Sequence, residues 1–550
     1  MKKMKKFFTF FLAIMLVFAC FAGCGQNNGD QSDKPSDDSS SGETPTTVEY
    51  DYYKNFKMNG DNKLLVWKGE DDNFAQAFTA IAIQGLFNRD EITYYNLTFS
   101  ANELWLQDLK DTYGVTTETV TFDSMVNAYK EKFGADAKYI LYDKAKNPES
   151  VNVATSLAGI FNAIPVDTTQ ERQFSSKKGY NMEKLMDVTE MTESDCYYDY
   201  KDKFATDALF QLSPDLWYPR DYWIAGKYYG FYQVDTDIST LAFRNRVQSW
   251  TDDDSPIFGW GPTTEGQDVT IASNNAEFTV ASDTSANMTV LCSDAWGTSF
   301  TQKSLHKEVT AQKGKHYVCI MMSDGDNIQA VSNTFPFSAA YYLADRENFK
   351  MGWTLNVSCV DLQPSIMNYL YRNMDENDYF VASVSGAGYM YPSSYPQEAL
   401  KLFTERLGNY LKRADCHSLQ ILEEAIDVDA FEYYSKIEGL YGCAVMSGWK
   451  YAAKHGSVYW KNGMPFVTCR FSLWETTGAN IAAQVNACEK DPTSINGYSV
   501  INVHPWSTSY TDVVELVKNL DENTIVVTAD NFFKMIRANV PQVDVDCTEN

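Results

Sequence analysis

The sequence lacks the short motifs that mark several large enzyme classes. Its five histidines form no HxxxH or HxH pair, and its cysteines form no CxxC pair. Zinc sites are commonly built from such pairs, so the sequence argues against a zinc hydrolase, a metal-dependent polysaccharide deacetylase or a zinc-ribbon protein. The chain also has no GxSxG elbow, Walker loop or Rossmann fingerprint. These absences argue against α/β-hydrolases, P-loop NTPases and dinucleotide-binding enzymes, and we predict no cofactor.

Positive charge and long hydrophobic runs are also scarce. The 46 Lys and Arg residues face 73 Asp and Glu residues, which gives a formal net charge of −27. Such a charge argues against nucleic acid and anionic membrane surfaces as partners. The longest apolar run, residues 7–18, is too short to span a bilayer as a stable anchor.

The first residues have the features of a secretory signal peptide, which we assign to residues 1–23. Four Lys precede the apolar run, and the small residues Ala22 and Gly23 precede Cys24. The sequence "FAGC" is typical of a bacterial lipobox, so we expect lipidation of Cys24; cleavage without a lipid, or lipidation of Cys20, is the alternative. Residues 24–49 are predicted to be a disordered linker, because residues 25–47 have no aliphatic or aromatic side chain. The protein is thus expected to be secreted and membrane-anchored by lipid, outside the cytoplasm.

The rest of the chain is predicted to be α/β, in two parts. Residues 50–310 alternate strand-like and helix-like segments, as expected for an N-terminal α/β domain. Residues 311–550 contain eight short apolar runs, with amphipathic segments between most of them: 316–322, 352–357, 379–384, 418–422, 443–446, 466–471, 499–503 and 524–527. Their number and spacing predict a C-terminal (β/α)8 barrel of the TIM type, and an open doubly wound sheet is the alternative.

Polar residues gather directly after these predicted strands. The first strand is followed by "SDGDN", in which Asp324 and Asp326 flank a glycine, and the sixth by "SLWE", which ends at Glu475. Active sites of parallel barrels lie at the carboxyl ends of the strands, so these side chains are expected to meet in one site.

Asp324, Asp326 and Glu475 are the predicted catalytic residues. An aromatic neighbour, Trp474, would raise the pKa of Glu475 and suit it to general-acid catalysis, although Glu475 could simply be a charge at a helix N-terminus. Asp326, in a polar turn, is expected to stay ionised and act as base or nucleophile. An ordinary Asp-Gly turn and a divalent-cation site at Asp324 and Asp326 are the alternatives.

Substrate-binding residues are predicted around the stretch "SGAGYMYP". Gly386 and Gly388 would permit positive φ or close approach of a ligand, and Tyr389 and Tyr391 would share one face of an extended chain. An ordinary packed loop is the alternative. The full set of predicted substrate-binding residues is Asn327, Asp361, Gly386, Gly388, Tyr389, Tyr391, Glu423, Trp449, Trp474, His504 and Trp506.

The stretch "GAGYMYP" resembles the signature of the GxGYxYP family of glycoside hydrolases. "MSDGDN", "GWTLNVS" and "YSVINVHPWS" are similar to the C-terminal domain of that family, and "ESVNVATSLAGIFNAIPVD" and "PIFGWGPTTEGQDV" are similar to its N-terminal domain. One departure is "NVSCVDL", where Ser358 and Cys359 stand in place of an expected Ser-Pro pair. The resemblance covers residues 60–545 and implies carbohydrate processing at a bacterial cell surface, but it transfers no catalytic residues.

Three functions are consistent with these features. The first is a glycoside hydrolase that acts on a poly- or oligosaccharide through paired carboxylates. The second is a non-catalytic lipoprotein that binds carbohydrate. The third is a metal-assisted hydrolase that uses Asp324, Asp326 and His504. Only the first requires two carboxyl groups across one cleft.

Overall fold

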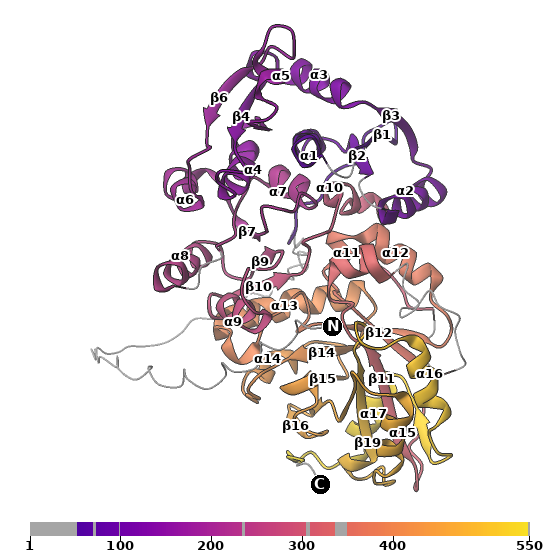
Figure 1. The fold of residues 1–550 in the computed structure, drawn as a ribbon. Coiled ribbons are helices and arrows are strands. Elements are labelled where there is room, and N and C mark those ends of the chain that lie inside the picture. The colour runs from indigo at the N-terminus through magenta and orange to yellow at the C-terminus, as the bar shows by residue number, and fades with distance from the viewer. Residues whose placement is uncertain are drawn as a thin grey trace, which may run out of the picture. The chain divides into compact units, whose positions relative to one another are not determined.

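The computed structural model describes residues 52–69, 73–97, 100–233, 237–303, 308–335 and 349–547 (Figure 1). These residues belong to one compact unit. The predicted signal peptide, Cys24 and the predicted linker lie outside the described residues. Among the described helices, none combines the length and the hydrophobicity needed to cross a bilayer.

The N-terminal half contains three separate parallel sheets, of three, three and four strands, in the orders β2-β1-β3, β5-β4-β6 and β10-β9-β7-β8. The strands are β1 (Lys63–Lys68), β2 (Tyr94–Leu97), β3 (Thr116–Val120), β4 (Lys138–Tyr142), β5 (Ile164–Asp167), β6 (Glu183–Asp187), β7 (Ala205–Gln211), β8 (Tyr228–Phe231), β9 (Ser255–Phe258) and β10 (Glu277–Val280). The predicted α/β class is confirmed for this half, but the region that we predicted as one domain holds three distinct sheets.

Helices connect the strands of these sheets. They are α1 (Phe74–Asn88), α2 (Ser100–Tyr113), α3 (Phe122–Phe133), α4 (Glu149–Phe161), α5 (Glu171–Ser175), α6 (Glu193–Tyr200), α7 (Arg220–Gly226), α8 (Ile238–Gln248), α9 (Glu265–Asn274) and α10 (Met288–Leu291). Several begin at a side-chain cap, which satisfies backbone N–H groups that have no partner within the helix. At α9, for example, Thr264 accepts a hydrogen bond from the backbone N–H of Gln267.

The C-terminal half is built on one ten-stranded sheet, in which β16 alone is antiparallel to its neighbour, β17. The strands are β11 (His316–Met322), β12 (Met351–Leu355), β13 (Asp378–Ala382), β14 (Ser418–Leu422), β15 (Gly442–Met446), β16 (Val458–Lys461), β17 (Met464–Thr468), β18 (Phe471–Leu473), β19 (Tyr498–Val503) and β20 (Thr524–Val526). Every residue of β11 to β15 is buried. This burial on both faces explains why these strands show no alternation of polar and apolar residues.

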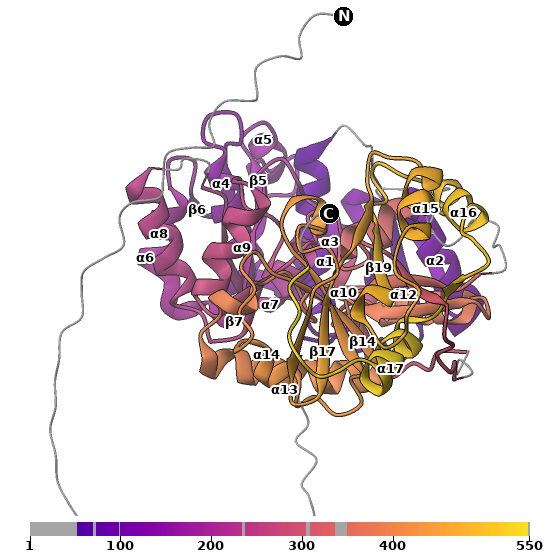
Figure 2. The same cartoon turned by 90° about the horizontal axis from the view of Figure 1, so that it is seen from below.

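The helices of this half are α11 (Cys359–Leu362), α12 (Pro364–Asn373), α13 (Gln397–Arg413), α14 (Phe431–Tyr434), α15 (Gly478–Asn486), α16 (Tyr510–Lys518) and α17 (Ala529–Asn539). Helix α17 packs against β11, β14, β15 and β17 together (Figure 2). Its residues Phe532, Phe533 and Ile536 lie in one hydrophobic cluster with side chains of those strands. The C-terminal helix therefore covers part of the sheet.

The sheet follows the path β16-β17-β15-β14-β13-β12-β11-β19-β18, and β20 pairs separately with β11. The predicted sixth strand, residues 466–471, spans the end of β17 and the start of β18. Between them, the N–H of Cys469 donates to Val445 O at 3.1 Å and the N–H of Arg470 donates to Val500 O at 3.0 Å. Among the described residues no strand pair joins β16 or β17 to β18, so closure into a barrel stays a prediction.

Candidate active site

The first strand of the C-terminal sheet ends in a turn that carries both predicted aspartates. Asp324 has a φ of 68°, and its carboxylate accepts a hydrogen bond from the Ser323 hydroxyl at 2.6 Å. The N–H of Gly325 donates to the Thr354 hydroxyl at 2.9 Å, which fixes the turn against β12. Asp324 is half-buried and Asp326 is buried. The Asp-Gly turn that was the simpler interpretation of this stretch is therefore also the element that carries both carboxylates.

Asp326 lies among groups that control its charge. Burial raises the pKa of Asp326 to about 7, and the negative charge of Asp324 adds to that shift. Hydrogen bonds from Tyr389 and Ser383 oppose it, the latter at 3.1 Å. We had expected a polar turn to keep this carboxyl ionised; instead, burial dominates and brings its pKa close to neutrality.

The signature loop, residues 386–392, joins the two halves of the protein. Tyr389 and Thr279 of β10 exchange two backbone hydrogen bonds, at 2.8 and 3.0 Å. A Cβ at Gly388 would meet Phe278 at 2.6 Å and Thr279 O at 2.7 Å. Gly386 has the expected positive φ, 125°, but a Cβ there would meet Leu407 at 2.6 Å. Packing of protein against protein, rather than approach of a ligand, therefore explains both glycines.

The tyrosines of this loop are buried and direct their hydroxyls at carboxylates. Tyr389 is 7% exposed and hydrogen-bonds to Asp326, and Tyr391 is 3% exposed and hydrogen-bonds to Glu424. The ring of Trp260 packs edge-on against Tyr389, with centroids 4.8 Å apart. These tyrosines are suited to positioning acidic groups and do not form an open stacking surface for sugars.

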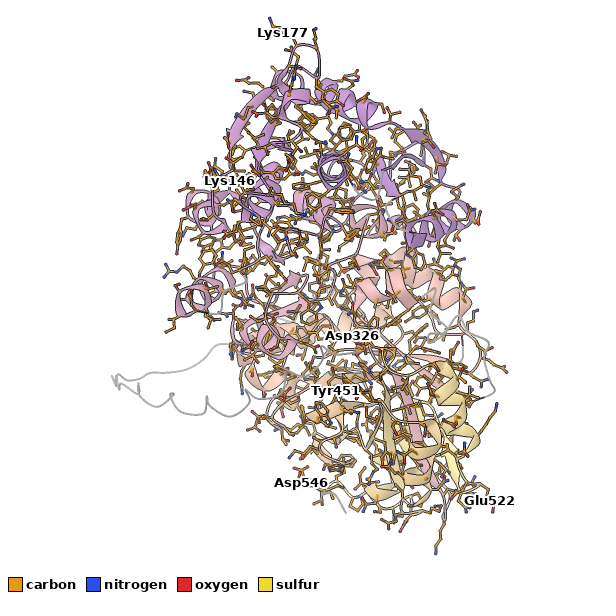
Figure 3. All side chains as sticks on the ribbon, in the orientation of Figure 1. Lys146, Lys177, Asp326, Tyr451, Glu522 and Asp546 are labelled. Carbon is orange, nitrogen blue, oxygen red and sulfur yellow. The ribbon has the colours of Figure 1, made fainter. Side chains whose placement is uncertain are left out.

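Aromatic rings do form a wall beside the aspartates. The rings of Trp474 and His504 stack with centroids 3.6 Å apart, and Tyr451 packs edge-on against Trp474 at 5.5 Å. The indole N–H of Trp506, two residues after His504, donates to the Asp324 carboxylate at 2.8 Å, which links the segment after β19 to the end of β11. Burial lowers the pKa of His504, while the negative charges of Asp324 and Glu475 oppose that shift. Asp326 and Tyr451 lie near each other in Figure 3; burial raises the pKa of the Tyr451 phenol, and the negative charge of Asp326 adds to that shift.

Glu475 has different surroundings from those predicted. Its side chain is 67% exposed, and its carboxylate pairs with the Lys450 ammonium at 3.1 Å. Lys450 also donates to Trp474 O at 3.0 Å. The apolar wall that we expected to favour the neutral acid is therefore not the main neighbour of this carboxyl group.

Glu265, the first residue of α9, is the acidic residue that sequence reasoning missed. Its side chain reaches solvent, yet desolvation by the protein around its carboxyl group raises its pKa to about 7. The negative charges of Asp324, Asp326 and Glu424 add to that shift. Its charge also acts on Tyr389, Tyr391 and Tyr451. The available signal was its place in "PIFGWGPTTEGQDV", just after a predicted strand.

The other predicted residues divide into exposed rings and structural groups. Trp449 is 80% exposed and Trp506 is 51% exposed. Glu423 is buried and accepts two hydrogen bonds from Ser393, at 2.9 and 2.6 Å, beneath the signature loop; burial raises its pKa to about 7. Asp361 is engaged with α13 instead, through Arg413 at 2.5 Å and Tyr410 at 2.9 Å.

Asn327 caps the segment that follows the aspartates. Its side-chain oxygen accepts a hydrogen bond from the N–H of Ala330 at 3.3 Å. Within the described part of the chain, no group of three or more His, Cys, Asp and Glu side chains is arranged to hold a metal ion.

Comparison with protein families identifies all four parts of the chain. Residues 314–537 match the "GxGYxYP putative glycoside hydrolase C-terminal domain". Residues 63–131, 137–204 and 206–293 match the first, second and third N-terminal domains of the same family. The chain belongs to the GxGYxYP family. In family terms, Glu265 comes from the third domain, and Asp324 and Asp326 come from the C-terminal domain.

The fold is shared with a solved structure. The crystal structure of "a putative hydrolase from Bacteroides thetaiotaomicron VPI-5482" superposes with a TM-score of 0.80 and is 24% identical, over 89% of this chain and 97% of that one. At this identity the likeness establishes the fold alone. None of the curated proteins compared with the chain matches it significantly.

Proposed function

We propose that this protein hydrolyses glycosidic bonds in a poly- or oligosaccharide at the carboxyl ends of the C-terminal strands. The observation that carries the proposal is the gathering of acidic groups at one place: Asp324 and Asp326 follow β11, and Glu265 begins α9 beside the loop whose Tyr389 hydrogen-bonds to Asp326. The pKa values of Asp326 and Glu265 are both raised to about 7. Glycoside hydrolysis needs one protonated and one ionised carboxyl group, and such a group can hold both forms near neutral pH.

The roles in this proposal follow the chemistry of each side chain. Asp326, with Asp324 beside it, is the base or nucleophile, because it accepts hydrogen bonds from Tyr389 and Ser383, which stabilise its ionised form against the opposing effect of burial. The exposed rings of Trp449 and Trp506, with the Trp474–His504 stack, provide apolar faces against which sugar rings can pack. Glu475 was the general acid predicted from sequence, and Glu265 is the second candidate for that role.

Release of new reducing ends tests the reaction. Full-length protein in detergent is incubated with a panel of purified plant, fungal and bacterial polysaccharides, and a heat-inactivated sample is the control. Time-dependent release from at least one polysaccharide is expected. If binding occurs without release from any member of the panel, the protein is a carbohydrate-binding lipoprotein instead. If hydrolysis requires an added divalent cation, the metal-assisted alternative applies.

We propose further that Cys24 carries a lipid that anchors the protein outside the cytoplasm. The support is the basic start, the short apolar run and the "FAGC" sequence. Cys24→Ala is expected to move the protein from the membrane pellet to the soluble fraction in the native host. A variant that still pellets with membranes would contradict this proposal.

We also propose that the C-terminal sheet closes as a barrel. β17 and β18 are separated by only Cys469 and Arg470, whose N–H groups donate to β15 and β19, so one bent segment bridges the two sides. If the sheet is closed, the backbone amide hydrogens of Cys469 and Arg470 are expected to exchange with solvent as slowly as those of β14. Fast exchange at both positions would indicate an open sheet.

A further inference from the structure

We propose that Glu265 is the general acid of this site, so that the third N-terminal domain supplies a catalytic residue to the C-terminal domain. This inference rests on the proposed glycoside hydrolysis and assigns its proton donor. The strand ends of the C-terminal sheet then form an incomplete catalytic centre, and α9 completes it.

The position of Glu265 is fixed from within its own domain. Asp268 lies in the same first turn of α9, and its buried carboxylate pairs with the buried guanidinium of Arg244 and accepts a hydrogen bond from the Thr263 hydroxyl. Thr264 caps the helix. The turn that presents Glu265 is therefore held on both sides of that residue.

Helix α9 is also fixed against the signature loop, chiefly at its C-terminal end. The Tyr391 N–H donates to the Ser273 hydroxyl of α9 at 2.9 Å, and β10 pairs with Tyr389 through two backbone hydrogen bonds. A Cβ at Gly266 would lie 3.6 Å from the Tyr391 hydroxyl. Glu265 thus sits beside the loop whose Tyr389 hydrogen-bonds to Asp326.

Glu265 differs from the other site carboxyls in lacking a partner. Among the described residues, its side chain makes no hydrogen bond and no ion pair, whereas Asp324, Asp326 and Glu423 accept hydrogen bonds and Glu475 pairs with Lys450. The groups that face it are acidic or phenolic: Asp324, Asp326, Glu424, Tyr389, Tyr391 and Tyr451. An unpaired carboxyl among negative charges favours its protonated form, and contact with solvent allows it to be reprotonated.

The proton balance follows from these positions. Glu265 gives its proton to the bridging oxygen while the bond from that oxygen to the anomeric carbon breaks, and the bonding electron pair stays on the oxygen. Water then supplies a hydroxyl to the anomeric carbon and a proton to a carboxylate of the site, which balances the proton that Glu265 gave. Asp324 and Asp326 supply the negative charge that stabilises the positive charge at the anomeric carbon.

Leaving-group dependence distinguishes a proton donor from a structural residue. The probes are phenyl and dinitrophenyl glycosides of the common hexoses, N-acetylhexosamines and pentoses. Dinitrophenolate departs without protonation, whereas phenolate needs an acid. Glu265→Gln is expected to lose about 10²- to 10⁴-fold in kcat with phenyl glycosides and far less with dinitrophenyl glycosides. Glu398→Gln is the matched control, because Glu398 is also an exposed acid in the first turn of a helix, α13.

Three results would overturn the assignment in distinguishable ways. If the wild type cleaves neither the glycosides nor any polysaccharide, the proposed function fails and the assignment fails with it. If the wild type cleaves a phenyl glycoside and Glu265→Gln loses equal activity with both leaving groups, or none, only the assignment fails. If Glu475→Gln shows the leaving-group dependence instead, the acid is Glu475.

Thermal unfolding tests the placement of Glu265 without any substrate. Desolvation and, after it, the neighbouring negative charges raise the pKa of Glu265 in the folded protein, so its ionisation lowers the stability of the native state as the pH rises through neutrality. Contact of this exposed side chain with solvent reduces the size of that effect. Glu265→Gln removes that effect, and its Tm is expected to exceed that of the wild type at about pH 8 and to equal it at about pH 4. A Tm difference that does not change with pH would contradict the placement.

Discussion

The two sides of the candidate site look alike in sequence and differ in structure. On the inner side, Asp326 follows β11, is buried, and is hydrogen-bonded by Ser383 and Tyr389. On the outer side, Glu475 follows β18, is largely exposed, and pairs with Lys450. Both are acids at strand ends close to aromatic rings. The third domain and the signature loop cover the inner side, so tertiary burial, and not the neighbouring residue in sequence, raises the pKa of Asp326.

The largest effect is expected on the inner side. Asp326→Asn keeps the shape of the side chain and removes its basicity, and is expected to lower kcat by about 10²- to 10⁴-fold, measured as reducing-end release. Asp427→Asn, in the exposed loop after β14, is the matched control and should retain wild-type turnover. Near-normal turnover of Asp326→Asn would show that Asp326 takes no part in catalysis.

The next largest effect is expected where the signature loop packs against β10, on the inner side of the site. Gly388→Ala would place a Cβ against Phe278 and the Thr279 carbonyl, and overpacking of this kind costs about 1 to 3 kcal/mol of unfolding free energy. Gly60→Ala is the control, because no atom lies within 4 Å of a Cβ there. Chemical denaturation measures both variants. If Gly388→Ala has wild-type stability but weaker substrate binding, the glycine serves the ligand, as the sequence interpretation held.

A smaller effect is expected from the hydroxyl that faces Asp326. Tyr389→Phe removes a hydrogen bond that favours the ionised carboxylate, so the pKa of Asp326 should rise above about 7. A base must be ionised, and the acidic limb of the pH profile of kcat/KM is therefore expected to move to higher pH by about one unit. A shift in the opposite direction would show that the hydroxyl favours the neutral acid.

The inner strands could be predicted from sequence because they are buried on both faces. The predicted runs 316–322 and 418–422 coincide with β11 and β14, since uninterrupted apolar residues are characteristic of such strands. The run 466–471 was predicted less well. The backbone N–H of Cys469 donates to β15, whereas that of Arg470 donates to β19. The spacing of apolar residues in the sequence does not reveal this change of partner strand.

Glu265 could not be predicted as a site residue for a related reason. In sequence it is an acid in the first turn of a helix, which is a common favourable position near the positive end of the helix dipole. Its function depends on docking of the third domain against the loop that contains Tyr389 and Tyr391, a contact between residues more than a hundred positions apart. Family resemblance marked the stretch but assigned no role to the glutamate.

The smallest effect is expected on the outer side. Glu475 forms one exposed ion pair, and such pairs contribute about 0 to 1 kcal/mol because water screens both charges. Glu475→Gln should therefore change the unfolding free energy by less than about 0.5 kcal/mol and lower kcat/KM by less than about tenfold, through a shift of Lys450 and the Trp474–His504 stack. Measuring Glu475→Gln and Asp326→Asn under the same conditions shows which of the two acids contributes more to turnover. If Glu475→Gln loses as much turnover as Asp326→Asn, then substrate binding must displace Lys450, and the exposed carboxyl group of Glu475 controls the chemistry at least as much as the buried Asp326.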